Sequence, residues 1–390
     1  MNILFYRYNS ICEPAIIRAL QSLGLTVVEE TSEMENKSIT PAKCVEIVSR
    51  DIREHKPVFV FSINFYPAIS QVCQLFQIPY LCWTVDSPVP ELFSTAITNS
   101  ANRIFLFDSA QYQTFARYNQ ENIYYLPLAA DIEHYNKVTD SITAADREKF
   151  HSDISFVGSL YNEKNPFDKI SGLSDYTKGF VDALTEASLR IYGYNPVEDA
   201  LPGSVTEEIK NCATNFYTLE QTVTNPDRYV AAHSYVGMHI AEAERIRTLN
   251  TLAEYFKVDL YTRSDCSDLV NVHVHDGVST LTEMPKIFHL SKINLNMTIK
   301  PIQNGLPLRI FDILGCGGFA MTNFQADLPE CFDIGVDLEA YGSMEELVEK
   351  CDYYLKHEDE RKQIALNGYQ RVCNEHTYIH RIRKMLETII

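Results

Sequence analysis

The chain lacks any long hydrophobic run, because nowhere do about 18 apolar residues follow one another, as a membrane-spanning helix needs. It also lacks an excess of basic residues: 34 Lys and Arg stand against 52 Asp and Glu, and the formal net charge is −18. Nucleic acids and anionic lipid surfaces both attract proteins through a basic footprint. The sequence therefore predicts a protein without a membrane span and without nucleic acid as its main partner.

The ten cysteines lack the C-x-x-C pairs of zinc sites and the spacing of a secreted disulfide framework. Several of them, such as Cys44, Cys82 and Cys351, stand inside apolar runs, where a buried free thiol is the usual state. The first residues, MNILFYRYNS, predict a strand and show no signal-peptide pattern. We therefore expect a cytoplasmic protein in a reducing compartment.

The length of 390 residues, with 45 % hydrophobic residues, suits two domains. In the first third, apolar runs of strand length alternate with helix-length segments, which predicts βαβ units and a parallel sheet covered on both faces. These predicted strands are 3–6, 25–28, 58–63, 80–83, 103–107 and 123–126. We interpret residues 1–138 as a Rossmann-like domain and the polar stretch 139–152 as a linker.

The parallel pattern returns in the second part of the chain, with predicted strands at 154–158, 258–261, 272–274, 292–296 and 319–322. The intervening stretch 166–256 is mainly helical in pattern, apart from one predicted strand at 189–194. The sequence thus predicts a second Rossmann-like domain over 153–375 that contains a largely helical insertion, followed by a last helix within 376–390. The predicted fold class is α/β, with two doubly wound parallel sheets.

Residues 292–323, KINLNMTIKPIQNGLPLRIFDILGCGGFAMTN, form the most informative stretch. A short helix is predicted at 307–314, and its start, with Asn304, Gly305 and Pro307, offers backbone N–H groups and a positive dipole end to an anion. Arg309 lies in the first turn, where the helix dipole disfavours a cation unless a negative group is bound nearby. One turn later, Asp312 could take both hydroxyls of a ribose. The alternative is a surface ion pair between these two side chains.

Ligands of open α/β sheets lie beyond the carboxyl ends of the strands, which here carry the loops RYNSICE, NFYP, TVDSPVPE and DSA. In the third of these, Asp86 follows a predicted strand and precedes two prolines that stiffen the loop. A carboxylate at this place could act as a general base toward an acceptor hydroxyl, or orient that hydroxyl. The alternative is an Asx-turn or N-cap aspartate.

Two further groups of polar residues have weaker patterns. Arg245 stands in HIAEAERIR, whose alternating charges predict a solvated helix face, although the guanidinium could also approach a phosphate. His273 and His275 alternate on one predicted strand, but a metal site would need a third ligand that the sequence does not indicate. We therefore predict no metal site.

These motifs resemble those of GT-B glycosyltransferases, in particular the CgeB-like (spore maturation protein type) group-1 family. The run R-I-F-D at 309–312 with its C-G-G turn is similar to the donor-site segment of that family, and the tail from residue 341 is similar to its closing helices. WTVDSP and IYYLPLAAD are similar to the N-terminal domain common in clostridial-type members. The resemblance implies two domains facing across a cleft, with the helix of 376–390 packing back on the N-terminal domain. It also implies a hexosyltransferase-like enzyme that moves a sugar from a nucleoside diphosphate sugar to a glycan, protein or small-molecule acceptor.

The resemblance assigns roles to further residues. Retaining members often carry V-G-R-L and then a Lys after the first strand of the donor domain; Gly158 and Lys164 match this pattern, whereas Ser159 stands in place of the Arg. Lys164 and Arg309 would then stabilise the leaving diphosphate, and the glycines at 315, 317 and 318 would permit the turn beneath it. GT-B enzymes work without a bound metal and the chain has no D-x-D motif, so we expect neither a metal nor a cofactor.

Two departures from the family pattern leave alternatives open. Where many members have E-x7-E, this chain has Asn304 and Asp312, so the first carboxylate is missing and the stereochemical course is not predicted. Together with Ser159, Asn304 favours a degenerate GT-B protein that binds a nucleotide or sugar as a partner without catalysis. A nucleotide-sugar epimerase on the same fold is a further alternative. An oligomer is possible in each case.

Overall fold

The computed structural model describes residues 1–389, which divide into two compact units. Unit 1 comprises Met1–Ala129, Tyr217–Pro226 and the chain from Thr377 onward, and unit 2 comprises Ala130–Phe216 and Asp227–His376. Each unit contains a six-stranded parallel sheet, which confirms the predicted α/β class. The predicted domain limits and the cleft between the domains stay predictions. The last residue of the predicted segment 376–390 lies outside the described residues.

The sheet of unit 1 has the strand order β2-β1-β3-β4-β5-β6. Its central strands are buried along their whole length, as a parallel sheet covered on both faces requires. The strands are β1 (Asn2–Tyr6), β2 (Thr26–Glu30), β3 (Val60–Ile63), β4 (Tyr80–Trp83), β5 (Asn102–Leu106) and β6 (Ile123–Tyr125). The helices are α1 (Glu13–Ser22), α2 (Ser32–Glu35), α3 (Pro41–His55), α4 (Pro67–Phe76), α5 (Ser109–Phe115) and α18 (Tyr378–Leu386).

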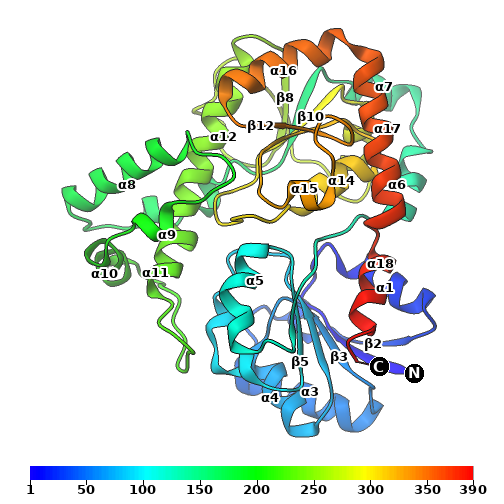
Figure 1. Ribbon diagram of the computed structural model, residues 1–390, viewed down its shortest axis with the longest axis vertical. Helices are drawn as coiled ribbons and strands as arrows, with labels where there is room; N and C mark the ends of the chain where they lie inside the picture. Colours follow the sequence, from blue (N-terminus) through cyan, green and yellow to red (C-terminus); the bar gives the residue numbers. More distant parts are fainter. Residues whose placement is uncertain (390) are drawn as a thin grey trace. The chain divides into compact units, whose positions relative to one another are not determined.

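Helix α18 belongs to unit 1 and lies beside α1 (Figure 1). Tyr378 at its start meets the buried ring of Trp83 edge to face at 5.9 Å. Arg381 donates to the carbonyl of Pro127 at 2.7 Å. The last helix is thus anchored by an aromatic contact and a partly buried hydrogen bond to the strand ends of the first sheet.

The sheet of unit 2 has the order β12-β11-β10-β7-β8-β9. Its strands are β7 (Ile154–Val157), β8 (Val258–Thr262), β9 (His273–Asp276), β10 (Ile293–Asn296), β11 (Ala320–Asn323) and β12 (Glu339–Tyr341), of which the last was not predicted. The helices are α6 (Ile132–Thr139), α7 (Ala144–Phe150), α8 (Asp175–Ser188), α9 (Val197–Ala200), α10 (Gly203–Cys212), α11 (Asp227–Tyr229), α12 (Gly237–Ala253), α13 (Met284–Leu290), α14 (Leu308–Gly315), α15 (Leu328–Cys331), α16 (Met344–Lys356) and α17 (Glu358–Glu375).

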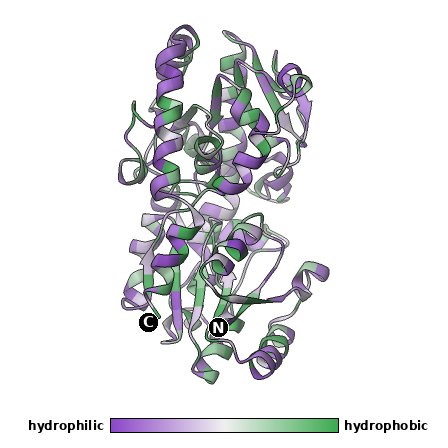
Figure 2. Ribbon diagram, turned by 90° about the vertical axis from the view of Figure 1, so that its right-hand side faces the viewer, coloured by the Kyte–Doolittle hydropathy of each residue, from purple (hydrophilic) through white to green (hydrophobic). Residues whose placement is uncertain are grey.

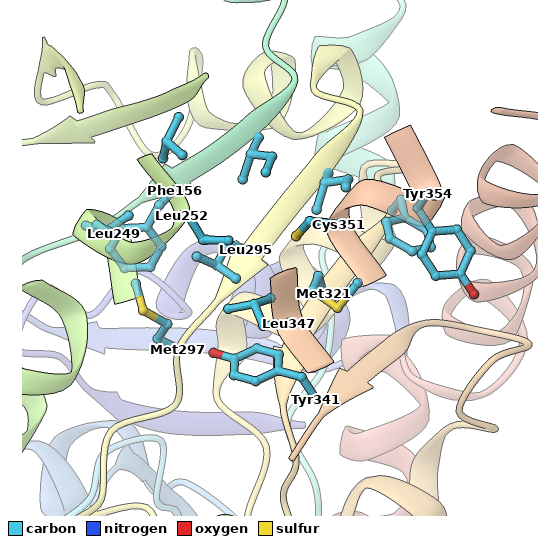
Figure 3. Packing of buried hydrophobic residues seen from close by; sticks show 14 of the residues in the cluster. Phe156, Leu249, Leu252, Leu295, Met297, Met321, Tyr341, Leu347, Cys351 and Tyr354 are labelled. Atoms are coloured by element: carbon cyan, nitrogen blue, oxygen red, sulfur yellow. The ribbon is translucent and has the colours of Figure 1, made fainter. Parts of the chain in front are cut away.

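The core cluster of unit 2 packs alternate strand side chains, such as Phe156, against residues of α12 and α16 (Figure 3). Leu295 and Met321 of the strands lie in one cluster with Leu347 and Cys351 of α16. In Figure 2 the strands carry mostly hydrophobic residues, whereas long stretches of the outer helices are hydrophilic. Among residues 1–389, no helix is both long and apolar enough to cross a bilayer.

Two segments differ from the sequence prediction, and a third, predicted as helical, has unusual helical geometry. Residues 189–194 form no strand, because the chain turns at Gly193 (φ 71°), whose N–H donates to the carbonyl of Phe324. The predicted linker carries α7, which begins at a Thr143–Asp146 capping box. The stretch 227–253 is one helical run in which the seven residues Val230–Val236 adopt π-helical geometry.

The segment Tyr217–Pro226 interrupts the helical insertion and belongs to unit 1. The N–H of Thr95 donates to the carbonyl of Gln221 at 3.2 Å, and the N–H of Val223 donates to the carbonyl of Phe93 at 2.8 Å. The segment therefore pairs in an extended form with the chain that follows the Asp86 loop.

Candidate functional site

Unit 2 contains a cavity of about 330 Å³ at the carboxyl ends of β7, β8 and β9. This is the edge at which open α/β sheets bind ligands. The predicted residues Gly158, Ser159, Lys164 and Arg309 line it, so the structure brings the two predicted phosphate-binding cations to one cavity. The other lining residues are Val157, Glu163, Tyr261, Thr262, Arg263, Ser264, Gly277, Val278, Thr280 and Met284.

Arg309 reaches the cavity from the first turn of α14, where the sequence placed it. Its side chain is 27 % exposed, and its guanidinium lies 5.3 Å from the centre of the Phe288 ring. Nη1 lies 3.3 Å from Oδ2 of Asp312. Pro307 is the N-cap residue of α14 and not its first helical residue, and no side chain caps this end. The arrangement holds a cation and a helix start at one side of the cavity.

Asp312 is buried behind Arg309, with only 4 % of its surface exposed, and does not line the cavity. Its Oδ1 accepts a 2.6 Å hydrogen bond from the Tyr135 hydroxyl, and its Oδ2 faces Arg309. Burial raises the pKa of Asp312, an effect that Arg309 and the Tyr135 hydroxyl oppose. The carboxylate thus ties α14 to α6 and orients the guanidinium. Its predicted contact with ribose hydroxyls stays a prediction.

The turn at the end of α14 carries three glycines, Gly315, Gly317 and Gly318, and each meets a specific steric requirement. A Cβ on Gly315 would lie 3.0 Å from Cβ of Ala130, and one on Gly318 would lie 2.5 Å from the carbonyl oxygen of Phe288. Gly317 has a φ of 71°, a left-handed conformation that glycine adopts without strain. The turn therefore needs glycine for close approach at two positions and for backbone conformation at the third.

Glu163 is a lining residue that the sequence analysis missed. Its Oε1 accepts a 2.5 Å hydrogen bond from the Ser159 hydroxyl, and its Oε2 accepts a 2.9 Å bond from the Ser264 hydroxyl. Partial burial would raise the pKa of Glu163, but the bonds from Ser159, its own backbone and Ser264, with the neighbouring charge of Lys164, lower it. Ser159 therefore holds a carboxylate at the cavity.

Arg245 is half-buried beneath the loop after β7, so the solvated-face interpretation does not hold for this residue. Its Nη1 donates to the carbonyl of Ser159 at 2.5 Å, and its Nη2 donates to the carbonyl of Met297 at 2.9 Å. The guanidinium lies 4.5 Å from the centre of the Tyr161 ring. Arg245 does not line the cavity; it connects the loops after β7 and β10.

Asn304 and Gly305 precede α14 in the loop after β10, and neither lines the cavity. The carbonyl of Asn304 accepts a 3.1 Å bond from the N–H of Asp327. Their predicted donor contacts stay predictions.

Asp86 lies in unit 1, exposed in the loop after β4. Its Oδ2 accepts a 2.7 Å bond from Nδ2 of Asn64 and lies 3.4 Å from the hydroxyl of Tyr8. Oδ1 of Asn64 accepts from the N–H of Val85 at 3.0 Å, so this asparagine also fixes the backbone of the loop. Burial, followed by the charge of Asp86, raises the pKa of Tyr8. The loops after β1, β3 and β4 thus position one carboxylate. These loops were predicted from the sequence to lie at the ligand edge of the sheet, whereas the contacts of Tyr8 and Asn64 with Asp86 were not predicted.

His273 and His275 lie on β9, at the edge of the second sheet. Nε2 of His275 lies 2.8 Å from Oδ1 of Asp259, and its ring stacks on that of Tyr261 at 4.5 Å. In the described part of the chain, no three His, Cys, Asp or Glu side chains form a group that could hold a metal ion.

Comparison with known proteins shows similarity to glycosyltransferases. Residues 229–387 match a protein family described as glycosyl transferase-like, and no curated protein matches the chain. Similar solved structures include a glycosyltransferase from Rickettsia africae, with 12 % identity, coverage of 100 % of this chain and 97 % of that one, and a TM-score of 0.54. HepE of Anabaena in complex with UDP has 12 % identity, coverage of 100 % and 99 %, and a TM-score of 0.54. Sucrose-phosphate synthase from Thermosynechococcus elongatus has 9 % identity, coverage of 99 % and 98 %, and a TM-score of 0.57. At these identities the likeness shows the fold, which is that of GT-B glycosyltransferases.

Proposed function

We propose that the protein is a glycosyltransferase that moves a sugar from a nucleoside diphosphate sugar to an acceptor. The observation that carries this proposal is the cavity of unit 2, which gathers Lys164, Arg263 and Arg309 in a chain whose net charge is −18. Cations at a cavity beyond parallel strands suit a diphosphate. The glycosyl transferase-like match over residues 229–387 includes Arg309 and supports the same activity. The CgeB-like subgroup is part of the proposal.

The donor is bound by unit 2 in this account. HepE of Anabaena has been solved with UDP and with UDP-glucose, so uridine diphosphate sugars are the first candidates. Arg309, oriented by Asp312, and Lys164 stabilise the negative charge that develops on the leaving diphosphate. Arg245 holds the loop that carries Ser159. Because these cations neutralise the diphosphate, we propose a transfer that needs neither a metal nor a cofactor.

The acceptor is bound by unit 1 in this account, and Asp86 is its catalytic residue. Asn64 and Tyr8 hold the carboxylate at the carboxyl edge of the first sheet, where it can accept a proton from an acceptor hydroxyl or orient that hydroxyl. The raised pKa of Tyr8 keeps its hydroxyl protonated and able to donate. The ten cysteines are all free within residues 1–389, which supports a reducing, cytoplasmic setting.

A second candidate is a binding protein of the same fold that holds a nucleotide sugar without transferring it. Ser159 at the place of a diphosphate-bracing arginine favours this candidate, because it removes one cation from the cavity and anchors Glu163 there.

The first test is a thermal-shift panel of nucleoside diphosphates and their sugars, followed by mass analysis of the donor after incubation. A ligand that binds only the native protein stabilises it by roughly 2.7 kcal/mol at 100 times its Kd, so one base should raise the melting temperature selectively. Release of nucleoside diphosphate supports transfer, and an isomeric nucleotide sugar indicates an epimerase. A shift with an unchanged donor favours the binding protein. The absence of any shift contradicts a donor site in unit 2.

A further inference from the structure

The cavity of unit 2 includes one carboxylate, Glu163, among its cationic lining residues. A carboxylate at this place repels a diphosphate, so its presence needs a reason other than phosphate binding. The side chain is exposed to the cavity and is held from two sides by hydroxyl groups on different loops, Ser159 after β7 and Ser264 after β8. Its position is therefore fixed before any ligand arrives.

The two serine bonds leave both carboxylate oxygens with further acceptor capacity. An ionised carboxylate accepts hydrogen bonds at about four lone-pair positions and donates none. Its partner must therefore bring donors, and a diphosphate brings none at neutral pH. The lowered pKa of Glu163 agrees with a carboxylate that stays charged in the cavity.

The position of Glu163 in the cavity limits which part of the donor its carboxylate can contact. Glu163 is next to Lys164 in the chain, and Lys164 is the proposed phosphate ligand. The groups on either side of the diphosphate in a nucleoside diphosphate sugar are the ribose and the transferred sugar, whereas the base lies one ribose further away. Both neighbours carry pairs of hydroxyls, which match a bidentate acceptor.

We infer that Glu163 binds a pair of neighbouring hydroxyls on a sugar directly attached to the donor diphosphate. The inference rests on the proposed function of the cavity. It moves recognition of sugar hydroxyls away from Asp312, whose two oxygens face Tyr135 and Arg309 and which is 4 % exposed. Glu163 is thereby a specificity residue that selects a sugar-bearing diphosphate over a bare one.

The test compares affinities of the wild-type protein with those of Glu163→Ala and Glu163→Gln by titration calorimetry in EDTA. Inorganic diphosphate should bind the variants as well as the wild type or better, because a repelling charge is gone. A nucleotide whose hydroxyls Glu163 accepts should bind the Ala variant roughly ten- to hundredfold more weakly, the usual loss for a hydrogen bond to a charged group. These two changes have opposite signs.

Probes with and without particular hydroxyls identify the sugar. If the ribose is the partner, the variants lose affinity for UDP, and 2′-deoxy-UDP binds wild type and variants equally weakly. If the transferred sugar is the partner, affinity for UDP is kept and only that for UDP-glucose falls. Asp265→Asn is the matched control, because Asp265 lies near Ser264 on the same loop, is exposed and does not line the cavity. It removes one negative charge and should leave all affinities within about twofold.

Two results would overturn the inference while leaving the proposed function intact. One is a wild-type protein that binds UDP or UDP-glucose, with Glu163→Ala binding both at least as tightly. The other is a loss that occurs only when Mg²⁺ replaces EDTA, which would make Glu163 a cation ligand. A wild-type protein that binds none of the nucleoside diphosphates of the panel overturns both the inference and the proposed function.

Discussion

At the scale of single residues, the hydroxyl of Tyr135 donates a hydrogen bond to the carboxylate of Asp312, which in turn orients Arg309 at the cavity. Tyr135→Phe leaves Oδ1 of Asp312 buried without this donor, which should lower the free energy of unfolding by about 1–3 kcal/mol. The loss should be larger at pH 8 than at pH 4, because burial already raises the pKa of Asp312 and the ionised form needs the donor most. Urea unfolding at both pH values measures it.

The control for Tyr135→Phe is Tyr194→Phe. Tyr194 donates to Asp199 at 2.5 Å, but its side chain is exposed, so water replaces the lost bond. The control should change the unfolding free energy by less than about 0.5 kcal/mol. Equal losses in the two variants would mean that burial does not strengthen the Tyr135 bond.

A second residue-scale prediction concerns the carboxylate pair Glu30 and Asp51 of unit 1. Burial, together with the hydrogen bond to Glu30, raises the pKa of Asp51 from 3.8 to about 6. Between these two values the folded protein keeps a proton that the unfolded chain has lost, so stability falls as the pH rises through this window. Asp51→Asn should remove that cost, which is roughly 3 kcal/mol at about 1.4 kcal/mol per pKa unit.

The measurement for Asp51→Asn is the difference in unfolding free energy between variant and wild type from pH 3.5 to pH 7. The variant should gain stability relative to the wild type as the pH rises, and the gain should level off above about 6. A difference that is the same at every pH would contradict the raised pKa.

Single residues also show how far the sequence could predict the site. Arg309 could be predicted from its place in the first turn of a helix, and Lys164 from its resemblance to the GT-B pattern after the first strand of the donor domain. Tyr135 could not, because its partner Asp312 is 177 residues away. The position of Glu163 could not be predicted either, because one of its two serine partners, Ser264, is 101 residues away. Sequence spacing carries information on local geometry only, so contacts between distant loops need the fold.

At the scale of elements, α17 packs closely against α14 because Gly368 of α17 has no side chain. A Cβ on Gly368 of α17 would lie 2.2 Å from the carbonyl oxygen of Asp337 and 2.8 Å from Cδ2 of Leu314 in α14. Gly368→Ala should therefore lower the free energy of unfolding by about 1–3 kcal/mol, although alanine favours a helix. Denaturant unfolding measures the change.

Gly179→Ala in α8 is the matched control, because a Cβ there meets nothing within 4 Å. This variant should gain about 0.5–1 kcal/mol from helix propensity alone. The opposite signs of the two changes separate close packing from propensity. A gain at both positions would show that α17 and α14 can move apart.

Elements were predicted best where one face or both faces are buried. Strand 80–83 was predicted with its observed limits, because its apolar run has the length of a strand and is too short for a helix. The predicted strand 189–194 was wrong: Tyr192 packs against the core cluster, as a strand residue would, yet Gly193 turns the chain. Burial alone does not distinguish a strand from a buried coil.

At the scale of the whole molecule, the two sheets give each unit a carboxyl edge with its own polar residues. Asp86, held by Asn64 and Tyr8, belongs to unit 1, and the cationic cavity belongs to unit 2. Asp86→Asn should therefore lower the rate of sugar transfer by about 10²–10⁴-fold and leave the affinity for the nucleoside diphosphate unchanged. A transfer assay and a titration on the same variant separate the two effects.

The central claim is that Lys164 and Arg309 bind the donor diphosphate. The most direct test compares the affinities of nucleoside, monophosphate and diphosphate for the wild type, Lys164→Ala, Arg309→Ala and the control Lys178→Ala, an exposed lysine on α8 outside the cavity. The account predicts that the two cavity variants bind the diphosphate at least about tenfold more weakly, bind the nucleoside unchanged, and that the control resembles the wild type. Diphosphate binding that is equal in all four proteins would contradict it.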